Sequence, residues 1–338
     1  MKIEERVSTF VQLGVRLKKL PEAILQDWMD AANAVNRWFT SESVQLALEG
    51  ILKFLAEPAL KAWVANYDLE TTKPRRVGVI MAGNIPLAGF HDFLAVLLSG
   101  NRILIKKSSQ DPVLLEKITA LLMEINPAFK NLISFVERLT EADAIISTGS
   151  DNSARYFEYY FSKIPHIIRK NRTSIAVLNG QEPEEERSKL GLDIFTYFGL
   201  GCRNVSKIYI PQAFPLDVFF RSIEKYAAII NHGKYANNYD YNKAIYLLKG
   251  ITIWDNGFVL LKEDAGIASP IAVIYFERYN SEEEVLAKIK SVQKKIQVIV
   301  SSNAWFPGSI PFGLAQIPEV TDYADNVDTL KFLSELKI

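Results

Sequence analysis

Apolar residues near the amino terminus recur at the three-to-four-residue spacing of an α-helix. The recurrence runs from about residue 7 to residue 67 and includes Val7, Phe10, Val11, Leu25, Trp28, Met29, Leu48, Ile51, Leu52 and Leu55. Such spacing places the apolar side chains on one face of each helix. The pattern predicts three or four amphipathic helices, followed by a linker at Thr71–Arg75.

After residue 75 the pattern changes to short runs of β-branched residues that alternate with helical stretches. Strands are predicted at Val77–Met81, Arg102–Lys106, Leu132–Phe135 and Ala144–Ser147, and then, beyond a break at His166–Arg172, at 174–178, 207–210, 257–261, 271–276 and 297–300. Strands that alternate with helices are typical of parallel sheets covered by helices. The chain is therefore predicted to form two α/β domains.

The composition is that of a globular protein. The chain has 338 residues, of which 49% are hydrophobic and 23% are charged, and this length is enough for about two cores. Lysine plus arginine and aspartate plus glutamate number 39 each, so no overall field attracts nucleic acid or an anionic membrane. Neither a membrane-span-length apolar run nor a signal-peptide core is evident. We expect a cytoplasmic enzyme or binding protein.

Cys202 is the only cysteine of the chain, so it cannot form an internal disulfide. A lone thiol either packs as a small buried hydrophobe or acts as an accessible nucleophile. Gly199 and Gly201 flank it and allow the backbone to approach a ligand closely, which a buried filler does not need. The three histidines lack metal-ligand spacing and one cysteine cannot build a soft-metal site, so we expect no metal.

Polar segments follow several predicted strands, at the sheet edge where ligands bind in α/β folds. Thr148-Gly149-Ser150 can offer backbone N–H groups to a phosphate, although a serine-capped turn explains it equally well. Lys106-Lys107-Ser108-Ser109 suits a ribose or phosphate, or is a solvated basic loop. The Asn84 amide is placed to donate to an oxyanion, or is an ordinary loop residue.

Three further segments each have two possible interpretations, one functional and one structural. Arg169-Lys170-Asn171-Arg172 is a basic patch that a phosphorylated ligand would pass, or a solvated hinge. His91-Asp92 is an acid–base pair, or serves packing and capping. The tyrosine- and asparagine-rich segment 233–242 is a loop that covers the substrate, or a helix cap.

Taken in order, five motifs resemble those of the aldehyde dehydrogenase superfamily, and within it the bacterial acyl-CoA reductases related to the fatty-acid reductase of luminous bacteria (LuxC-like). They are Asn84-Ile85-Pro86-Leu87, Gly100-Asn101 with Lys106, Thr148-Gly149-Ser150, Cys202 with Ser206-Lys207, where the family has Ser-Arg, and Pro311-Phe312-Gly313. The resemblance implies an aldehyde-dehydrogenase-like α/β fold. Residues 1–172 would form the N-terminal helices and a Rossmann-like NAD(P)-binding domain, residues 173–320 the catalytic domain, and residues 321–338 a tail that returns to the cofactor domain.

The resemblance also implies roles for individual residues. Cys202 would be the catalytic nucleophile, and the Asn84 amide would help form the oxyanion hole. The cofactor would contact Lys106, Lys107, Ser108, Ser109, Thr148, Gly149 and Ser150. Arg169, Arg172 and Arg203 are expected to contact the substrate or coenzyme A.

The chain departs from the family pattern at three acidic positions. Ile168 stands where hydrolytic members carry a glutamate general base, which favours transfer to or from a thiol over attack by water. Ser109 replaces the acid that would hold the ribose 2′-hydroxyl, which leaves room for a 2′-phosphate beside Lys106 and Lys107. NADPH is therefore expected, with NADH left open. The glutamate that holds the nicotinamide ribose in the family aligns near Gly266, before Ser269-Pro270, so the nicotinamide position stays open.

These features together predict an acyl-CoA reductase that forms an aldehyde through an acyl-enzyme on Cys202. Two alternatives stay open: a reductase that uses an acyl phosphate or an acyl carrier protein as donor, and a non-catalytic homologue that binds acyl thioesters or nucleotides. We expect acyl-CoA as substrate and no nucleic-acid partner. An acyl-supplying partner enzyme and a homo-oligomer are left open.

Overall fold

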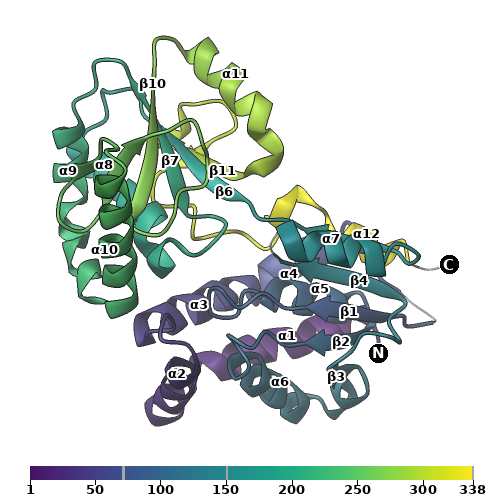
Figure 1. Ribbon diagram of the computed structural model, residues 1–338. Helices are drawn as coiled ribbons and strands as arrows, with labels where there is room; N and C mark the ends of the chain where they lie inside the picture. Colours follow the sequence, from purple (N-terminus) through teal and green to yellow (C-terminus); the bar gives the residue numbers. More distant parts are fainter. Residues whose placement is uncertain (71–72, 150, 337–338) are drawn as a thin grey trace. The chain divides into compact units, whose positions relative to one another are not determined.

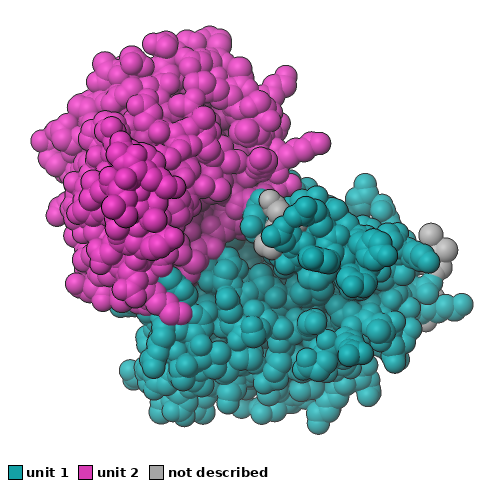
Figure 2. All heavy atoms as spheres, viewed as in Figure 1, with its two compact units in different colours: residues 1–171, 318–338 teal, residues 172–317 magenta. Residues whose placement is uncertain are grey.

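The computed structural model describes residues 1–70, 73–149 and 151–336 (Figure 1). It divides into two compact units, residues 1–171 with 318–338 and residues 172–317 (Figure 2). Two residues of the expected linker, Thr71 and Thr72, lie outside the described residues. Each unit is built around its own sheet.

The first unit begins with the predicted amphipathic helices. They are α1 (Ile3–Lys18), α2 (Glu22–Val35), α3 (Ser41–Phe54) and α4 (Glu57–Val64). The Thr40 side chain caps α3 by accepting a hydrogen bond from Ser43 N at 3.2 Å. Apolar side chains such as Phe10, Leu13 and Trp63 are buried in the core of this unit. The helices predicted from apolar spacing are confirmed.

A five-stranded parallel sheet forms the centre of the first unit. Its strands are β1 (Arg76–Ile80), β2 (Arg102–Lys106), β3 (Ile133–Phe135), β4 (Ala144–Thr148) and β5 (His166–Arg169), in the order β3-β2-β1-β4-β5. The helices α5 (Phe90–Leu98), α6 (Leu114–Ile125) and α7 (Asp151–Tyr160) follow β1, β2 and β4. β2 and β3 lie on one side of β1 and β4 and β5 on the other, so the strand order reverses between the parallel strands β1 and β4. This pair is the topological switch point, where such sheets bind ligands.

The prediction of a break from His166 onward was wrong for its first residues. His166–Arg169 forms β5, which pairs in parallel with β4 and places Ile167 opposite Ile146. Only two apolar residues stand between a histidine and an arginine, so the strand has no alternation that a sequence can reveal. Its pairing with β4, a tertiary contact, makes the segment extended.

The carboxyl-terminal segment of the chain belongs to the first unit. It carries α12 (Thr329–Ser334). The Tyr323 hydroxyl accepts from Trp63 Nε1 at 2.7 Å and lies 3.0 Å from the Tyr67 hydroxyl, which donates to Asp328 at 2.8 Å. These bonds attach the segment to the N-terminal helices.

His91 lies against the same aromatic group. Its ring packs 5.1 Å from the Trp63 ring and 5.5 Å from the Tyr323 ring, and Nε2 lies 2.8 Å from Val320 O. Burial lowers the pKa of His91. The packing alternative for His91 is therefore favoured over acid–base chemistry.

The second unit holds a seven-stranded sheet in the order β12-β11-β6-β7-β10-β9-β8. Its strands are β6 (Thr173–Val177), β7 (Val205–Pro211), β8 (Trp254–Asp255), β9 (Leu260–Glu263), β10 (Val273–Tyr279), β11 (Ile296–Ser301) and β12 (Ile310–Pro311). All pairs are parallel except β8 with β9. The helices are α8 (Glu184–Phe195), α9 (Leu216–Ile223), α10 (Gly233–Leu248) and α11 (Glu282–Val292).

Segment 233–242, which was expected to be a loop or a helix cap, forms most of α10. Its asparagines lower helix propensity. Burial of Tyr235, Tyr239 and Tyr246 along one face offsets that cost. The helix therefore depends on tertiary packing, which local composition does not show.

Candidate active site

Cys202 lies in a tight turn between α8 and β7. The turn closes through a hydrogen bond from Asn204 N to Gly201 O at 3.0 Å, so Cys202 and Arg203 are its two central residues. The Cys202 side chain is exposed. Ser174 Oγ donates to Cys202 O at 3.1 Å. The thiol is thus accessible, while the main chain that carries it is held in place.

The residues just before this turn adopt the left-handed backbone conformation. Tyr197, Phe198 and Gly199 have φ values of 53°, 59° and 79°. The two residues that are not glycine each cost about 1–3 kcal/mol of strain in this region. The Phe198 ring stacks on the His232 ring with centroids 4.2 Å apart. Of the two glycines that flank Cys202, Gly199 therefore serves a backbone conformation that favours glycine.

Ser206 and Lys207, which end the cysteine motif, hold the segment after β9. Ser206 Oγ donates to Ile267 O at 2.6 Å, and Lys207 Nζ donates to Asp264 O at 2.6 Å. The segment contains Gly266, whose N–H donates to Asp264 Oδ1 at 2.8 Å. The lysine that replaces arginine thus has a clear structural role.

Asp193 on α8 fixes the Pro-Phe-Gly turn, which begins at the last residue of β12. Its buried carboxylate accepts from Gly313 N at 2.7 Å and from Ala315 N at 2.9 Å. Burial raises the pKa of Asp193 to about 6, against the opposing effect of these two bonds and of the Arg203 charge. Gly313 has φ +84°, so a side chain here would be strained.

One predicted catalytic segment and one predicted cofactor segment follow the two strands at the switch point of the first unit. Asn84 follows β1 and is exposed, whereas Thr148 is the last residue of β4, the neighbouring strand, and Gly149 follows it directly. A Cβ on Gly149 would lie 3.0 Å from Ser153 Cβ, on the first turn of α7. A side chain at position 149 would therefore crowd the first turn of α7. The third residue of this motif, Ser150, lies outside the described residues.

The β1 loop is packed tightly against the loop after β2. A Cβ on Gly83 would collide with the Ser108 side chain, and Leu87 has φ 57°. Asp111 Oδ2 accepts from Leu87 N at 2.8 Å, and burial raises the pKa of this carboxyl group. These contacts hold the loop that carries Asn84.

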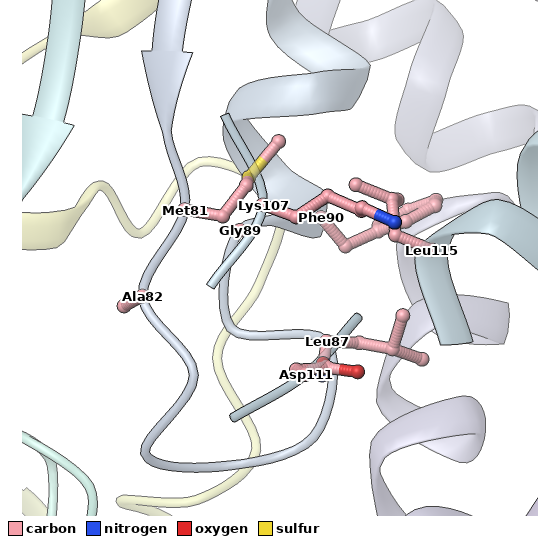
Figure 3. Close-up of a pocket in the computed structure, with 8 residues that line it drawn as sticks. All are labelled: Met81, Ala82, Leu87, Gly89, Phe90, Lys107, Asp111 and Leu115. Carbon is pink, nitrogen blue, oxygen red and sulfur yellow. The ribbon is translucent and has the colours of Figure 1, made fainter. Parts of the chain in front are cut away.

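A recess of about 10 Å³, which is room for about one water molecule, lies beside these loops (Figure 3). Its lining is mostly apolar, with the charged groups of Lys107 and Asp111. Ligand pockets usually measure about 300–1,000 Å³. The recess is smaller and is a packing feature of the loops.

The basic loop after β2 has two kinds of side chain. Lys106 and Ser109 are exposed. Lys107 instead pairs with Glu116 at 2.5 Å, and Ser108 Oγ accepts from Gln110 N at 3.2 Å. Lys106 and Ser109 are thus the better placed of the four to meet a ligand.

The three arginines predicted to contact substrate all bond within their own units. Arg169 is buried and holds Asp92 through two bonds, at 2.6 and 2.9 Å, and Thr329 at 2.9 Å. Arg172 donates to Ile296 O at 3.2 Å, and Arg203 donates to Ala315 O. These contacts favour structural roles, most strongly for Arg169, and the substrate roles stay predictions.

Several other predicted residues have a clear place in the structure. Ile168 lies in β5, opposite Ser147 of β4. Gly100-Asn101 precedes β2, at the opposite end of that strand from Lys106, and Asn101 Oδ1 accepts from Arg75 N at 2.9 Å. Asn101 therefore fixes the entry to β2.

Sequence reasoning missed Asp193 and Asn204. Asp193 shares the buried face of α8 with Leu190 and Ile194. An acidic residue at helical spacing among apolar residues is the feature of the sequence that could have revealed it. Asn204 stands inside the cysteine motif, but only its contacts in the folded chain distinguish it from an ordinary turn residue.

The described part of the chain contains neither a candidate metal site nor a candidate membrane-spanning helix. Within it, no three His, Cys, Asp or Glu side chains come together as a metal site would require. None of its helices combines the length and the apolar character that crossing a membrane demands.

Comparison with known proteins identifies a matching family and a related protein of that kind. The profile of the family described as acyl-CoA reductase (LuxC) matches residues 16–213. A long-chain acyl-protein thioester reductase of Aliivibrio fischeri is 23% identical over 247 residues, which cover 62% of this chain and 51% of that protein. The chain thus spans about half the length of the curated relative it matches.

Solved structures of aldehyde dehydrogenases share the fold. An NAD⁺ complex from Bacillus cereus matches with a TM-score of 0.64 and 14% identity, over 89% of this chain and 72% of that one. KauB from Pseudomonas aeruginosa matches with a TM-score of 0.65 and 13% identity over the same shares. The predicted fold, with two largely parallel sheets and N-terminal helices, is confirmed. With its family match over more than half of its length, the chain belongs to the acyl-CoA reductase (LuxC) family, within the aldehyde dehydrogenase structural superfamily.

Proposed function

We propose that this protein reduces an acyl-CoA thioester to an aldehyde, with Cys202 as the nucleophile. The main support for this proposal is the exposure of Cys202. The only cysteine of a chain in this family is exposed at the centre of a turn whose main chain is held by Asn204 and Ser174. An accessible thiol on a fixed backbone suits covalent catalysis, whereas a structural cysteine would be buried.

The first half of the reaction is acyl transfer. The Cys202 thiolate attacks the thioester carbonyl, a carbon–sulfur bond to Cys202 forms, and the bond to coenzyme A breaks. The departing thiolate takes a proton from solvent. Asn84 is the proposed donor to the oxyanion, since it is an exposed amide on a loop held by Asp111.

A nicotinamide cofactor, when bound, would supply the hydride that reduces the acyl-enzyme to the aldehyde level. The proposed residues for holding it are Lys106, Lys107, Ser108, Ser109, Thr148, Gly149 and Ser150. The strand order and the close approach of the Gly149 backbone to α7 support this assignment. Release of the aldehyde returns the electron pair of the carbon–sulfur bond to Cys202 as thiolate.

The cofactor preference is proposed to be NADPH. Lys106, the last residue of β2, and Ser109, in the loop that follows, are both exposed, and Ser109 brings no negative charge. A 2′-phosphate would be attracted by the lysine and would meet no carboxylate at that position. NADH stays the alternative.

Water is proposed to be a poor acyl acceptor in this protein. Ile168, at the position of the glutamate base in hydrolytic relatives, has no group that can accept a proton. The acyl-enzyme would therefore persist until hydride reaches it or a thiol reclaims the acyl group.

A second candidate concerns the acyl donor. The name of the Aliivibrio fischeri relative describes an acyl-protein substrate, which favours a protein-borne acyl group as the alternative to acyl-CoA. Release of coenzyme A in step with the aldehyde would support the first candidate. Turnover with an acylated protein and none with acyl-CoA would support the second.

The test of the function compares wild type with Cys202→Ser across short, medium and long acyl-CoA substrates. NADPH oxidation and aldehyde formation should appear with wild type and fall to background with the variant. Comparable turnover by the variant would overturn the mechanism. Cofactor binding without turnover by wild type would favour a non-catalytic homologue.

A further inference from the structure

The Asn204 side chain joins the cysteine turn to the end of α8. It is 2% exposed. Its Oδ1 accepts from Gly201 N at 2.8 Å. Its Nδ2 donates to the carbonyl oxygens of Thr196, Asp193 and Ile194, at 2.8, 3.1 and 3.2 Å. One side chain thus connects the residue before Cys202 with three carbonyl groups that end the helix and begin the left-handed segment.

These partners require an amide. The Oδ1 atom faces an N–H group, and the Nδ2 atom faces three carbonyl oxygens, so a reversed amide would meet donors with a donor and acceptors with an acceptor. A carboxylate in the same place would keep the bond to Gly201 and would repel the three carbonyls. Asn204 is therefore specified by its surroundings down to the orientation of its amide.

The main chain of the turn is held from β6 as well. Ser174 N donates to Asn204 O at 3.1 Å, and Ser174 Oγ donates to Cys202 O at 3.1 Å. The turn is thus fixed by α8 through the Asn204 amide and by β6 through Ser174. Cys202, between these two attachments, keeps an exposed side chain on a backbone with little freedom.

We infer that Asn204 is a positioning residue, which sets the reactivity of the Cys202 thiol by fixing the turn through its side-chain amide, with Ser174 as a weaker second support. As a statement about catalysis the inference rests on the proposed function. As a statement about the thiol it does not, because Cys202 is the only cysteine and its chemistry can be measured without turnover.

The test measures the rate of alkylation of the full-length protein by iodoacetamide as a function of pH. The variants are Asn204→Asp and the milder Ser174→Ala, and the urea-unfolded chain is the reference. The control is Asn242→Asp, because Asn242 is also a buried amide that donates to two backbone carbonyls, at 2.9 and 3.0 Å, but on α10.

We expect Asn204→Asp to move the pH profile of alkylation toward that of the unfolded chain, and Ser174→Ala to move it less in the same direction. The kcat/KM for acyl-CoA should fall about tenfold or more in Asn204→Asp, since small displacements of a nucleophile are costly. Asn242→Asp should leave the profile unchanged. If Asn204→Asp does not fold, the alkylation profile of Ser174→Ala alone tests the inference.

Native profiles in folded Asn204→Asp and Ser174→Ala would overturn the inference. So would a wild-type profile that coincides with that of the unfolded chain, because the turn would then impose nothing on the thiol. The activity of Cys202→Ser distinguishes failure of the positioning role of Asn204 from failure of the proposed function. If that variant is inactive while the profiles do not move, only the positioning role fails; if it is active, the proposed function fails.

Discussion

The ammonium group of Lys207 lies 2.6 Å from the carboxylate of Glu277, and the lysine side chain is fully buried. Its Nζ also donates to Asp264 O. The other Glu277 oxygen lies 2.6 Å from Lys288 Nζ. Lys207 therefore links β7, β10 and the segment after β9, directly beyond the cysteine turn.

Replacement of Lys207 by Met should destabilise the second unit. The change leaves Asp264 O and the Glu277 carboxylate without their buried donor, and breaking a buried pair from one side costs about 3–5 kcal/mol. Urea unfolding measures the loss. Lys288→Met is the control, because it touches the same carboxylate from a half-exposed position and should cost about 1 kcal/mol or less. Equal losses in the two variants would contradict this account of Lys207.

Asp193 should make stability depend on pH. Its folded-state pKa of about 6 lies above the ordinary 3.8, so between these values the folded chain binds a proton that the unfolded chain has lost. The contribution of Asp193 to stability is therefore greatest below the unfolded pKa and falls as pH rises toward 6.

Urea unfolding of wild type and Asp193→Asn at pH values from about 4 to 7 measures this effect. The stability of wild type relative to the variant should decline by on the order of 1–2 kcal/mol across that range. Asp217→Asn, at an exposed site on α9, should show no such trend. A difference that grows with pH would show that the charged form of Asp193 is the one the fold prefers.

Gly199 should tolerate a side chain poorly. Its φ of +79° favours glycine, so Gly199→Ala should cost about 1 kcal/mol in the free energy of unfolding. Gly233→Ala is the control, since Gly233 begins α10 without a left-handed φ and has no atom within 4 Å of an added Cβ. A loss in the control that matches the loss at Gly199 would refute the conformational explanation.

Ser109 should influence the choice of cofactor. Ser109→Glu places a carboxylate where a 2′-phosphate is proposed, so the ratio of kcat/KM for NADPH to that for NADH should fall about tenfold, or about 1.4 kcal/mol. Gln110→Glu adds the same charge at the next exposed position and should change the ratio much less. An unchanged ratio in Ser109→Glu would remove the basis for expecting NADPH.

The sequence predicted those parts of the fold that local pattern encodes. The N-terminal helices and β1 to β4 have clear apolar periodicity, and the order of five short motifs indicated the superfamily. β5 has only Ile167 and Ile168 as apolar residues, and α10 is stabilised by three buried tyrosines, so both depend on contacts that appear only in the folded chain.

The sequence predicted which residue types form the candidate site, but not which buried side chains hold them in place. The exposed Cys202 follows from a motif, whereas the roles of Asp193 and Asn204 follow from partners up to 122 positions away. A basic residue in a sequence is also ambiguous. Lys106 is exposed, while Arg169 is buried against Asp92, and nothing in the local sequence separates the two cases.

The most direct test of the central claim is to trap the acyl-enzyme. Wild-type protein is mixed with acyl-CoA in the absence of any nicotinamide cofactor, digested, and analysed by mass spectrometry while released coenzyme A is counted. We expect one acyl group per chain, on the peptide that contains Cys202, with an equal amount of released coenzyme A, and we expect neither in Cys202→Ser. Acylation of a different residue, or coenzyme A release that persists in Cys202→Ser, would contradict the proposed role of Cys202.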